Sequence, residues 1–147
     1  MIYFISGHRD ITVKDFFKHY KKPIDKAIKE SGIHSHFVVG DCMGVDIMAM
    51  TYLAAKNIRN VTIYHMFEEP RYYQYPFGLR GGYVSDVDRD LAMTIASDVD
   101  IAWTAKGRER SGTGQNIERR IWVEERKKKG LTYTLKDIQV REANNFL

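Results

Sequence analysis

The sequence predicts a single α/β domain over residues 1–147, with a Rossmann-like fold in which helices cover both faces of a mostly parallel sheet of about five strands. Short apolar runs typical of buried strands alternate with longer segments of helical periodicity. Glycines often stand where one kind of segment ends and the next begins. Strand–helix–strand units form parallel sheets, and a chain built from them is a three-layer α/β/α sandwich.

The expected strands are short runs rich in apolar and β-branched residues. The run 2–6 ends at Gly7 and the run 36–39 ends at Gly40, so each stops at a residue that permits a tight turn. On this basis we expect strands at 2–6, 36–39, 61–66, 99–104 and 131–134.

The expected helices are segments in which apolar residues recur every three or four positions. They lie at 13–31, 45–58, 86–97 and 113–129. Pro23 interrupts the first of them, so we expect a kink or two helices that meet near Lys21 and Lys22. Residues 67–85 lack clean periodicity and contain two prolines, which predicts a long functional or mobile loop.

The charge pattern argues against a nucleic acid as the main partner. The net charge is +4, but the basic residues of 119–129 are interleaved with Glu124 and Glu125. This arrangement is typical of a solvated helix face, whereas a duplex-binding surface is a continuous stripe of one sign. A small anionic ligand suits a modest positive excess equally well.

Cysteine usage and hydropathy predict a cytoplasmic protein with no membrane partner. Cys42 is the only cysteine, so no internal disulfide can form, which fits a reducing compartment. The chain contains no apolar run of membrane-spanning length, and its first residues lack the features of a signal peptide.

Neither a metal ion nor another cofactor is expected. The five histidines have no coherent ligand spacing, and a single cysteine cannot complete a zinc site. The chain also contains neither the G-x-G-x-x-G pattern nor a Walker motif, which excludes an ordinary dinucleotide or P-loop site.

Two glycine-containing stretches directly follow predicted strands. After the first strand, Gly7 permits close approach of a ligand, His8 is a candidate general acid or base, and Arg9 is a candidate anion ligand. An Arg9–Asp10 surface pair is the plain alternative. The second stretch, 40–46, contains Gly40, Asp41, Gly44 and Asp46. Its glycines could turn backbone N–H groups toward an anion, and its aspartates could bind ribose or simply begin the next helix.

Two further stretches lie at predicted helix starts. In residues 86–90, Arg89 lies among three aspartates, so it is either a phosphate clamp or part of a solvated ion network. Residues 111–114 open the helix 113–129, where free N–H groups and the helix dipole favour an anion. Capping would need only one hydroxyl residue, so this stretch predicts phosphate binding. Its residues are Ser111, Gly112, Thr113 and Gly114.

With these four stretches in order, the chain is similar to the SLOG superfamily, and within it to the YspA/YpsA-related branch. Members of that branch carry Gly-Ser-Arg-Asp, Gly-x-x-x-Gly-x-Asp, Arg-Asn-x-x-Met and Ser-x-Gly-Thr in the same order. The matching residues here are 6–10, 40–46, 89–93 and 111–113. The resemblance covers residues 3 to about 120 and implies a Rossmann-like domain that binds a nucleotide or a nucleotide-derived ligand.

The same resemblance implies several activities. Similar proteins include LOG-type phosphoribohydrolases, which cleave the N-glycosidic bond of a nucleoside monophosphate, sensors of nucleotide signals, DprA-like nucleic-acid binders and, in outline, nucleoside deoxyribosyltransferases. The phosphoribohydrolases carry a glutamate three residues after the threonine, but this chain has Asn116 there, which cannot act as a base. Asp90 adds a carboxylate where the nearest branch has asparagine.

These observations predict a nucleotide-binding domain, acting as a sensor or processing its ligand at the carboxyl edge of the sheet. An N-glycosidic hydrolase or transferase is the alternative, with Asp90, Asp46 or Asp41 as the candidate catalytic carboxylate. A nucleic-acid binder is the third interpretation. The aromatic residues of 67–85 are expected to form either a lid over a base or a subunit interface, and we expect a homo-oligomer, most simply a dimer.

Overall fold

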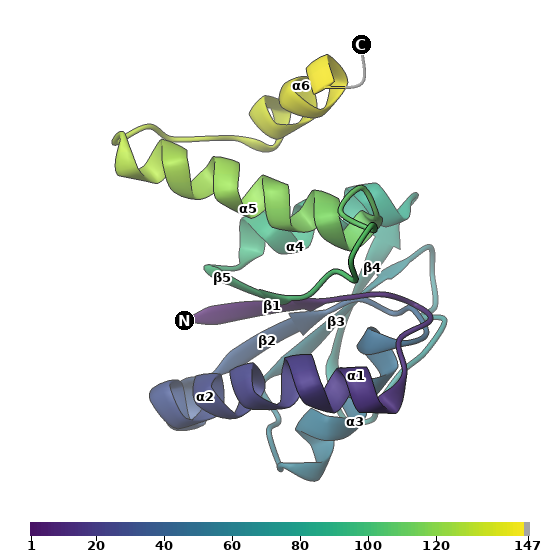
Figure 1. Ribbon diagram of the computed structural model, residues 1–147. Coiled ribbons are helices and arrows are strands. Elements are labelled where there is room, and N and C mark those ends of the chain that lie inside the picture. The colour runs from purple at the N-terminus through teal and green to yellow at the C-terminus, as the bar shows by residue number, and fades with distance from the viewer. Residues whose placement is uncertain (146–147) are drawn as a thin grey trace.

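The computed structural model describes residues 1–145 and has the predicted α/β fold. Its centre is a five-stranded sheet in the order β4-β3-β2-β1-β5, in which every neighbouring pair of strands is parallel. Helices cover both faces, which gives the three layers seen in Figure 1. The strands are β1 (Ile2–Ser6), β2 (His36–Val39), β3 (Val61–Met66), β4 (Gly78–Tyr83) and β5 (Val99–Ala102).

β1 lies where the strand order reverses. The chain adds β2, β3 and β4 on one side of β1 and β5 on the other. Ile5 pairs with Val39 of β2 and with Ile101 of β5, so the carboxyl ends of these three strands meet at one edge. In open parallel sheets, ligands bind at this switch point, outside the carboxyl ends of the strands.

The first helical segment, 13–31, is interrupted as expected. Pro23 cannot donate an intrahelical hydrogen bond, and a π-helical turn stands immediately before the helix that contains it. The predicted break near Lys21 and Lys22 is therefore confirmed. The elements of this face are α1 (Val13–Phe16), the π turn η1 (Phe17–Lys21), α2 (Lys22–Ser31), the 3₁₀ turn η2 (Gly32–His34) and α3 (Val45–Ala55).

Alternation along the central strands divides the core between the two faces of the sheet. Tyr3 and Ile5 of β1 pack with the α1–α3 side, whereas Phe4, between them, packs with Met93 on the opposite side. Tyr20 of η1 is fully buried, and its hydroxyl donates a hydrogen bond of 2.7 Å to the carbonyl oxygen of Ser6. The π turn thereby supports the end of β1, where the predicted site begins.

The opposite face carries α4 (Asp86–Ala96) and α5 (Gly112–Lys128), and α6 (Leu135–Asn145) lies outside them, as Figure 1 shows. Leu91 of α4, Val123 of α5 and Ile138 of α6 form one apolar cluster. This cluster attaches α6 to the rest of the domain.

Two sequence-based expectations are wrong. Residues 131–134 form no strand but connect α5 to α6, and the remaining strand of the sheet is β4, within the segment expected to be a loop. β4 contains three glycines and is mostly exposed at the edge of the sheet, so it lacks the apolar run that reveals a buried strand. The helix α6 was also not predicted. Its start could have been recognised from Thr134 and Asp137, whose side chains each accept a hydrogen bond from the backbone amide of the other.

Several expected ends shift by a few residues. α3 ends at Ala55, three residues before the expected position, and β5 ends at Ala102 instead of residue 104. Among the helices of residues 1–145, none is long and apolar enough to cross a bilayer.

Candidate functional site

A cavity of about 310 Å³ opens at the switch point, outside the carboxyl ends of β1, β2 and β5. The starts of α4 and α5 form further parts of its wall, so it collects residues from all four predicted stretches. It is lined by Phe4, Ser6, Gly7, His8, Arg9, Asp10, Gly40, Cys42, Asp46, Asp86, Arg89, Asp90, Met93, Arg108, Ser111, Gly112, Thr113 and Asn116. Of the predicted site residues, Asp41, Gly44 and Gly114 do not line it.

The start of α5 offers backbone donors to the cavity. Ser111 is the N-cap, and its hydroxyl accepts from the amide of Gly114 at 3.2 Å. The amides of Gly112 and Thr113 belong to the first turn, where α-helical N–H groups lack an intrahelical acceptor. Both residues line the cavity. This wall can therefore hold an anion, assisted by the dipole of a 17-residue helix.

Packing against neighbouring segments explains the glycines at 7, 44 and 114. A Cβ at Gly114 would overlap the backbone carbonyl of Glu109, and one at Gly44, where φ is +79°, would overlap backbone atoms of His8. A Cβ at Gly7 would overlap Val45. These glycines allow close approach of protein segments that build the site, and they need no ligand to explain them.

Gly40 differs because the side chains beside it belong to the cavity. A Cβ there would lie 2.6 Å from Oδ2 of Asp46 and 3.0 Å from the guanidinium carbon of Arg89. The absence of a side chain at the end of β2 therefore lets α3 and α4 bring these two charged groups together over the strand.

Two arginines stand at the mouth of the cavity, each paired with an aspartate. Arg9 contacts Asp86 at 2.8 Å, and Arg108, in the loop before α5, contacts Asp10 at 2.7 Å. Both guanidiniums are about half exposed, so these pairs contribute little to stability and can exchange their carboxylate for a ligand phosphate. Arg108 was not predicted as a site residue. It stands three residues before the Ser111 cap, in the loop that follows β5, and this position could have indicated it.

Arg89 lies at the back of the cavity with its donors engaged. Its Nη1 contacts Asp41 at 2.8 Å and Asp86 at 3.0 Å, and its Nε and Nη2 donate to Oδ1 of Asp90 at 3.1 and 2.9 Å. The guanidinium is 6% exposed. The arginine that the sequence indicated as a phosphate clamp or an ion-network member thus holds three carboxylates in place.

Asp41 lies beneath the cavity and is fully buried. Besides Arg89, it accepts from Arg71, which donates from its backbone amide at 2.9 Å and from Nη2 at 2.9 Å. The two arginines lower the pKa of Asp41 against the opposing effect of burial. Asp41 therefore joins the segment after β3 to α4, and the sequence had no signal for the contribution of Arg71.

Asp46 lies in the first turn of α3 and lines the cavity from a buried position. Its Oδ2 accepts from the amide of Cys42 at 3.0 Å. Burial raises the pKa of Asp46 to about 7, because the attraction of Arg89 does not fully offset the loss of solvation. A carboxyl group in this state can both release and accept a proton near neutral pH.

Asp90 also lines the cavity, and Asn116 of α5 contacts it. The Nδ2 of Asn116 donates to Oδ2 of Asp90 at 3.0 Å, while Oδ1 of Asp90 accepts from Arg89. Asn116 is 2% exposed. Asn116 of α5 thus contacts a carboxylate supplied by a different helix, α4.

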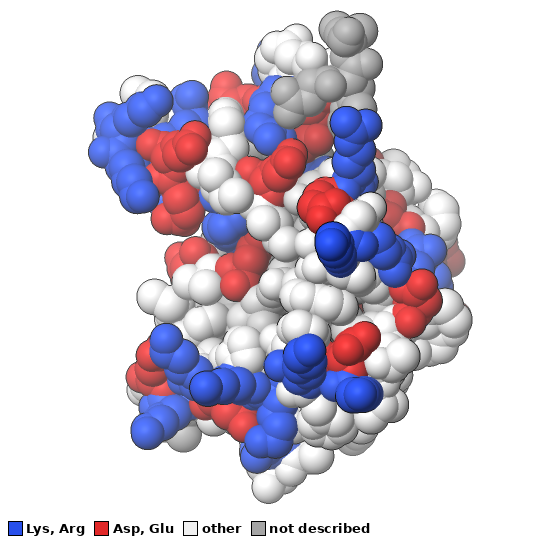
Figure 2. All heavy atoms as spheres, viewed as in Figure 1, with Lys and Arg blue, Asp and Glu red and all other residues white. Residues whose placement is uncertain are grey.

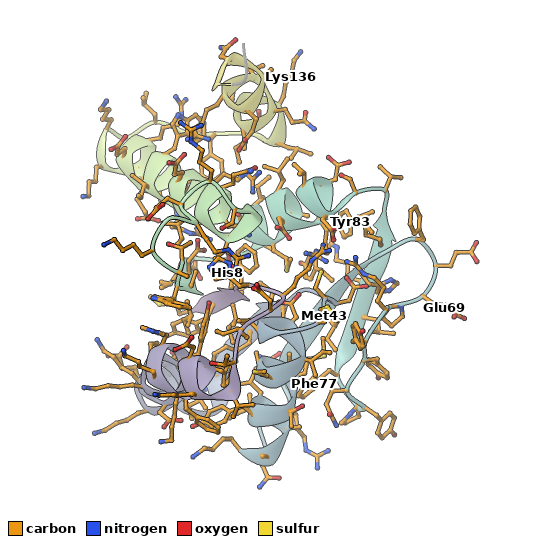
Figure 3. All side chains as sticks on the ribbon, turned by 45° about the vertical axis from the view of Figure 1, so that its right-hand side comes forward. His8, Met43, Glu69, Phe77, Tyr83 and Lys136 are labelled. Atoms are coloured by element: carbon orange, nitrogen blue, oxygen red, sulfur yellow. The ribbon has the colours of Figure 1, made fainter. Side chains whose placement is uncertain are left out.

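His8 is engaged in the structure of the site. Its Nε2 accepts from the backbone amide of Ala105 at 2.9 Å, so its proton lies on Nδ1. Burial, followed by the nearby Arg108, lowers the pKa of His8. In Figure 3, His8 lies between the end of β1 and the start of α5, where this contact joins the first strand to the loop after β5.

Cys42 is a buried thiol in the cavity wall. Nη2 of Arg71 and Nη1 of Arg89 lie 3.2 and 3.3 Å from its sulfur. Burial nonetheless raises the pKa of Cys42, because desolvation outweighs the two positive charges. The thiol form is therefore favoured at neutral pH.

The aromatic side chains of 67–77 do not line the cavity. Phe77 is buried in the core against the α3 side, and Figure 3 shows Glu69 at the outer tip of the segment. Tyr72 and Tyr75 are exposed. From this segment Arg71 donates hydrogen bonds to Asp41 and Asp86, and a lid and a subunit interface both stay predictions.

The described residues 1–145 contain no group of three or more His, Cys, Asp or Glu side chains arranged to hold a metal ion. On the face in Figure 2, Lys and Arg are intermixed with Asp and Glu over α5 and over the side formed by α1 and α2. Comparisons with models of protein families, with curated proteins and with solved structures find no match to this chain.

Proposed function

We propose that this protein binds a nucleoside monophosphate, or a small ligand derived from a nucleotide, in the cavity outside β1 and β5. The observation that carries this proposal is the joining of two unlike walls in one cavity. The first turn of α5 offers unpaired N–H groups beside Arg108, and these can donate hydrogen bonds. Asp46 and Asp90 offer carboxylates to the same cavity, and these can accept hydrogen bonds. A nucleotide presents the same combination, an anionic phosphate and a sugar with donor hydroxyls.

The size of the cavity favours a single nucleotide over a dinucleotide. Its volume of about 310 Å³ lies at the lower end of the roughly 300–1,000 Å³ usual for small-molecule sites.

A second observation is the hydroxyl of Ser6, which lines the cavity. It is buried and has no hydrogen-bond partner within the described residues. A bound ligand would provide that partner.

Calorimetry with the four common ribonucleoside 5′-monophosphates and the matching nucleosides tests this proposal. We expect at least one monophosphate to bind with micromolar affinity and its nucleoside to bind at least about tenfold more weakly, because the nucleoside lacks the charge-assisted contacts of the phosphate. Equal affinity for nucleoside and monophosphate, or no binding by either class, would refute it.

A second candidate function is cleavage or transfer at the N-glycosidic bond. The observation that favours it is Asp46, a cavity carboxyl whose pKa is raised to about 7 by burial. In such a reaction Asp46 gives its proton to the leaving base as the bond to C1′ breaks. Water adds to C1′, its spare proton passes to a cavity carboxylate, and Asp90 stabilises the positive charge that develops on the sugar.

Chromatography separates this activity from binding alone. Release of free base from a nucleoside monophosphate, abolished in Asp46→Asn and Asp90→Asn, is the result expected of a hydrolase. Recovery of the intact nucleotide after prolonged incubation with saturating protein would exclude the hydrolase and leave a sensor or sequestering protein.

A further inference from the structure

A chain of buried polar contacts runs from α6 to the cavity. Glu142 of α6 accepts from Nε of Arg119, and Nη1 of Arg119 donates to Oδ1 of Asn116. Nδ2 of Asn116 then donates to Asp90 at 3.0 Å. Arg119 is 1% exposed, although it belongs to a helix whose other face is solvated. A buried arginine with this pattern of contacts requires an explanation, because desolvation of a guanidinium is costly.

Arg119 determines which way the Asn116 amide faces. A guanidinium can only donate hydrogen bonds, so the atom of Asn116 that contacts it must be the carbonyl oxygen. The amide nitrogen is then turned toward Asp90. Without Arg119, the side chain of Asn116 would lose the donor that fixes its carbonyl oxygen, and only its contacts with Asp90 and solvent would orient the amide.

The turned amide in turn orients Asp90. Its Oδ2 accepts from Asn116 and its Oδ1 accepts from Arg89, so donors from two different helices hold the carboxylate. Both contacts use Asp90 as a hydrogen-bond acceptor, one at each carboxylate oxygen. Its remaining lone pairs are available to the cavity, because Asp90 lines it.

We propose that Glu142 and Arg119 are positioning residues, through which the docked helix α6 holds the Asp90 carboxylate in a fixed orientation as an acceptor for the hydroxyl groups of the ligand sugar. The ligand step of this inference rests on the proposed function, whereas the chain of contacts exists in the free protein.

Other charged groups share the cavity with Asp90, as His8 does, or contact its partners Arg89 and Asn116 or the residues that these contact, and any pH-dependent effect must be measured relative to them. Arg89 and Asp86 share its helix. The groups from other elements are Asp41 and Cys42 after β2, Asp46 of α3, Arg119 of α5 and Glu142 of α6. All of them remain unchanged in an Asn116 variant.

A matched pair of variants tests the contact between Glu142 and Arg119, with which the series of polar contacts begins. Glu142 and Glu118 both pair with Arg141, but only Glu142 contacts Arg119. With adenosine 5′-monophosphate as the probe, we expect Glu142→Ala to weaken binding about tenfold and Glu118→Ala to change it by less than about twofold. Glu142→Gln keeps an acceptor oxygen and should restore most of the affinity. Equal effects of the two alanine variants would overturn the proposal.

Asn116→Asp tests the inner end without changing the shape of the side chain. The new carboxylate still accepts from Arg119, but it repels Asp90 unless one proton is shared between them. We expect binding to be at least about tenfold weaker than wild type near pH 8 and to approach wild type near pH 5. An affinity ratio to wild type that is constant over this range would overturn the proposal even if Glu142→Ala fails to fold.

Amide spectra of the free proteins distinguish failure of this inference from failure of the proposed function. The side-chain N–H₂ signals of Asn116 should shift in Glu142→Ala and stay in place in Glu118→Ala. If the signals shift but wild type binds no nucleotide, the proposed function fails and the contact chain stands. If wild type binds and the signals do not move, the contact chain is wrong.

Discussion

Asp41 and Arg89 form a buried ion pair beneath the cavity, with 2.8 Å between Oδ1 and Nη1 and no exposure of the aspartate side chain. The pair connects the turn after β2 to α4, and Arg71 joins it from the segment after β3. Three segments that are distant in sequence thus depend on one carboxylate for their relative placement.

Replacing Asp41 should therefore destabilise the whole site. Asp41→Ala leaves the buried guanidinium of Arg89 without one of its partners, so we expect a loss of about 3–5 kcal/mol in the free energy of unfolding. Urea denaturation measures this loss. Asp10→Ala, which removes an exposed carboxylate paired with Arg108, is the control and should change the free energy of unfolding far less than Asp41→Ala does. Similar losses in both variants would contradict the role of Asp41.

The two glycines at the start of α5 should respond differently to alanine. A Cβ at Gly114 would overlap the carbonyl of Glu109, whereas one at Gly112 would meet no atom within 4 Å. We expect Gly114→Ala to lower the free energy of unfolding by about 1–3 kcal/mol and Gly112→Ala to leave it within about 0.5 kcal/mol. Thermal melts of the two variants provide the comparison, and a stable Gly114→Ala would show that the loop before α5 yields easily.

The backbone donor at Gly112 can be removed without removing the helix. Gly112 is the first helical residue after the Ser111 cap, where proline is well tolerated and Ser111 is already extended. Gly112→Pro deletes the N–H, so nucleoside monophosphate affinity should fall about tenfold while the helix content is unchanged. Gly112→Ala, which retains the N–H, serves as the control in calorimetry. Full affinity in Gly112→Pro would place the phosphate elsewhere.

Stability should fall as pH rises through neutrality, because of Asp46. Its folded pKa of about 7 is above the usual value for an aspartate, so the folded state binds a proton that the unfolded state releases. The resulting stabilisation is complete below about pH 4 and is lost as pH rises through about 7.

Asp46→Asn removes this dependence. We expect the variant to match wild type near pH 4 and to be more stable by about 2–4 kcal/mol near pH 8, as measured by urea denaturation. Asp100, whose pKa burial raises to about 6, contributes a trend of the same sign in both proteins and cancels in the difference. A difference between the two proteins that does not vary with pH would contradict the assignment to Asp46.

Much of the fold and part of the site could be predicted from local patterns. The strands 2–6, 36–39 and 61–66 agree with β1, β2 and β3, because buried strands are continuous apolar runs. β4 could not be recognised, since an exposed glycine-rich edge strand owes its conformation to hydrogen bonds with β3 and not to its own side chains. Three of the predicted site residues, Asp41, Gly44 and Gly114, lie outside the cavity lining because local sequence does not reveal which side of a turn faces inward.

The sequence by itself determined the alternation of strands and helices, the strand-end positions of the candidate residues and the helix start at Ser111, because each depends on residues within a few positions of one another. Only the tertiary structure decided what those residues contact. Arg89 holds aspartates instead of standing free, Asn116 turns toward Asp90 because Arg119 occupies its other side, and α6 reaches the site through Glu142. The long-range contacts of Arg89 with Asp41, Asn116 with Asp90 and Arg119 with Glu142 join residues 23 to 48 positions apart, so they arise only in the folded domain.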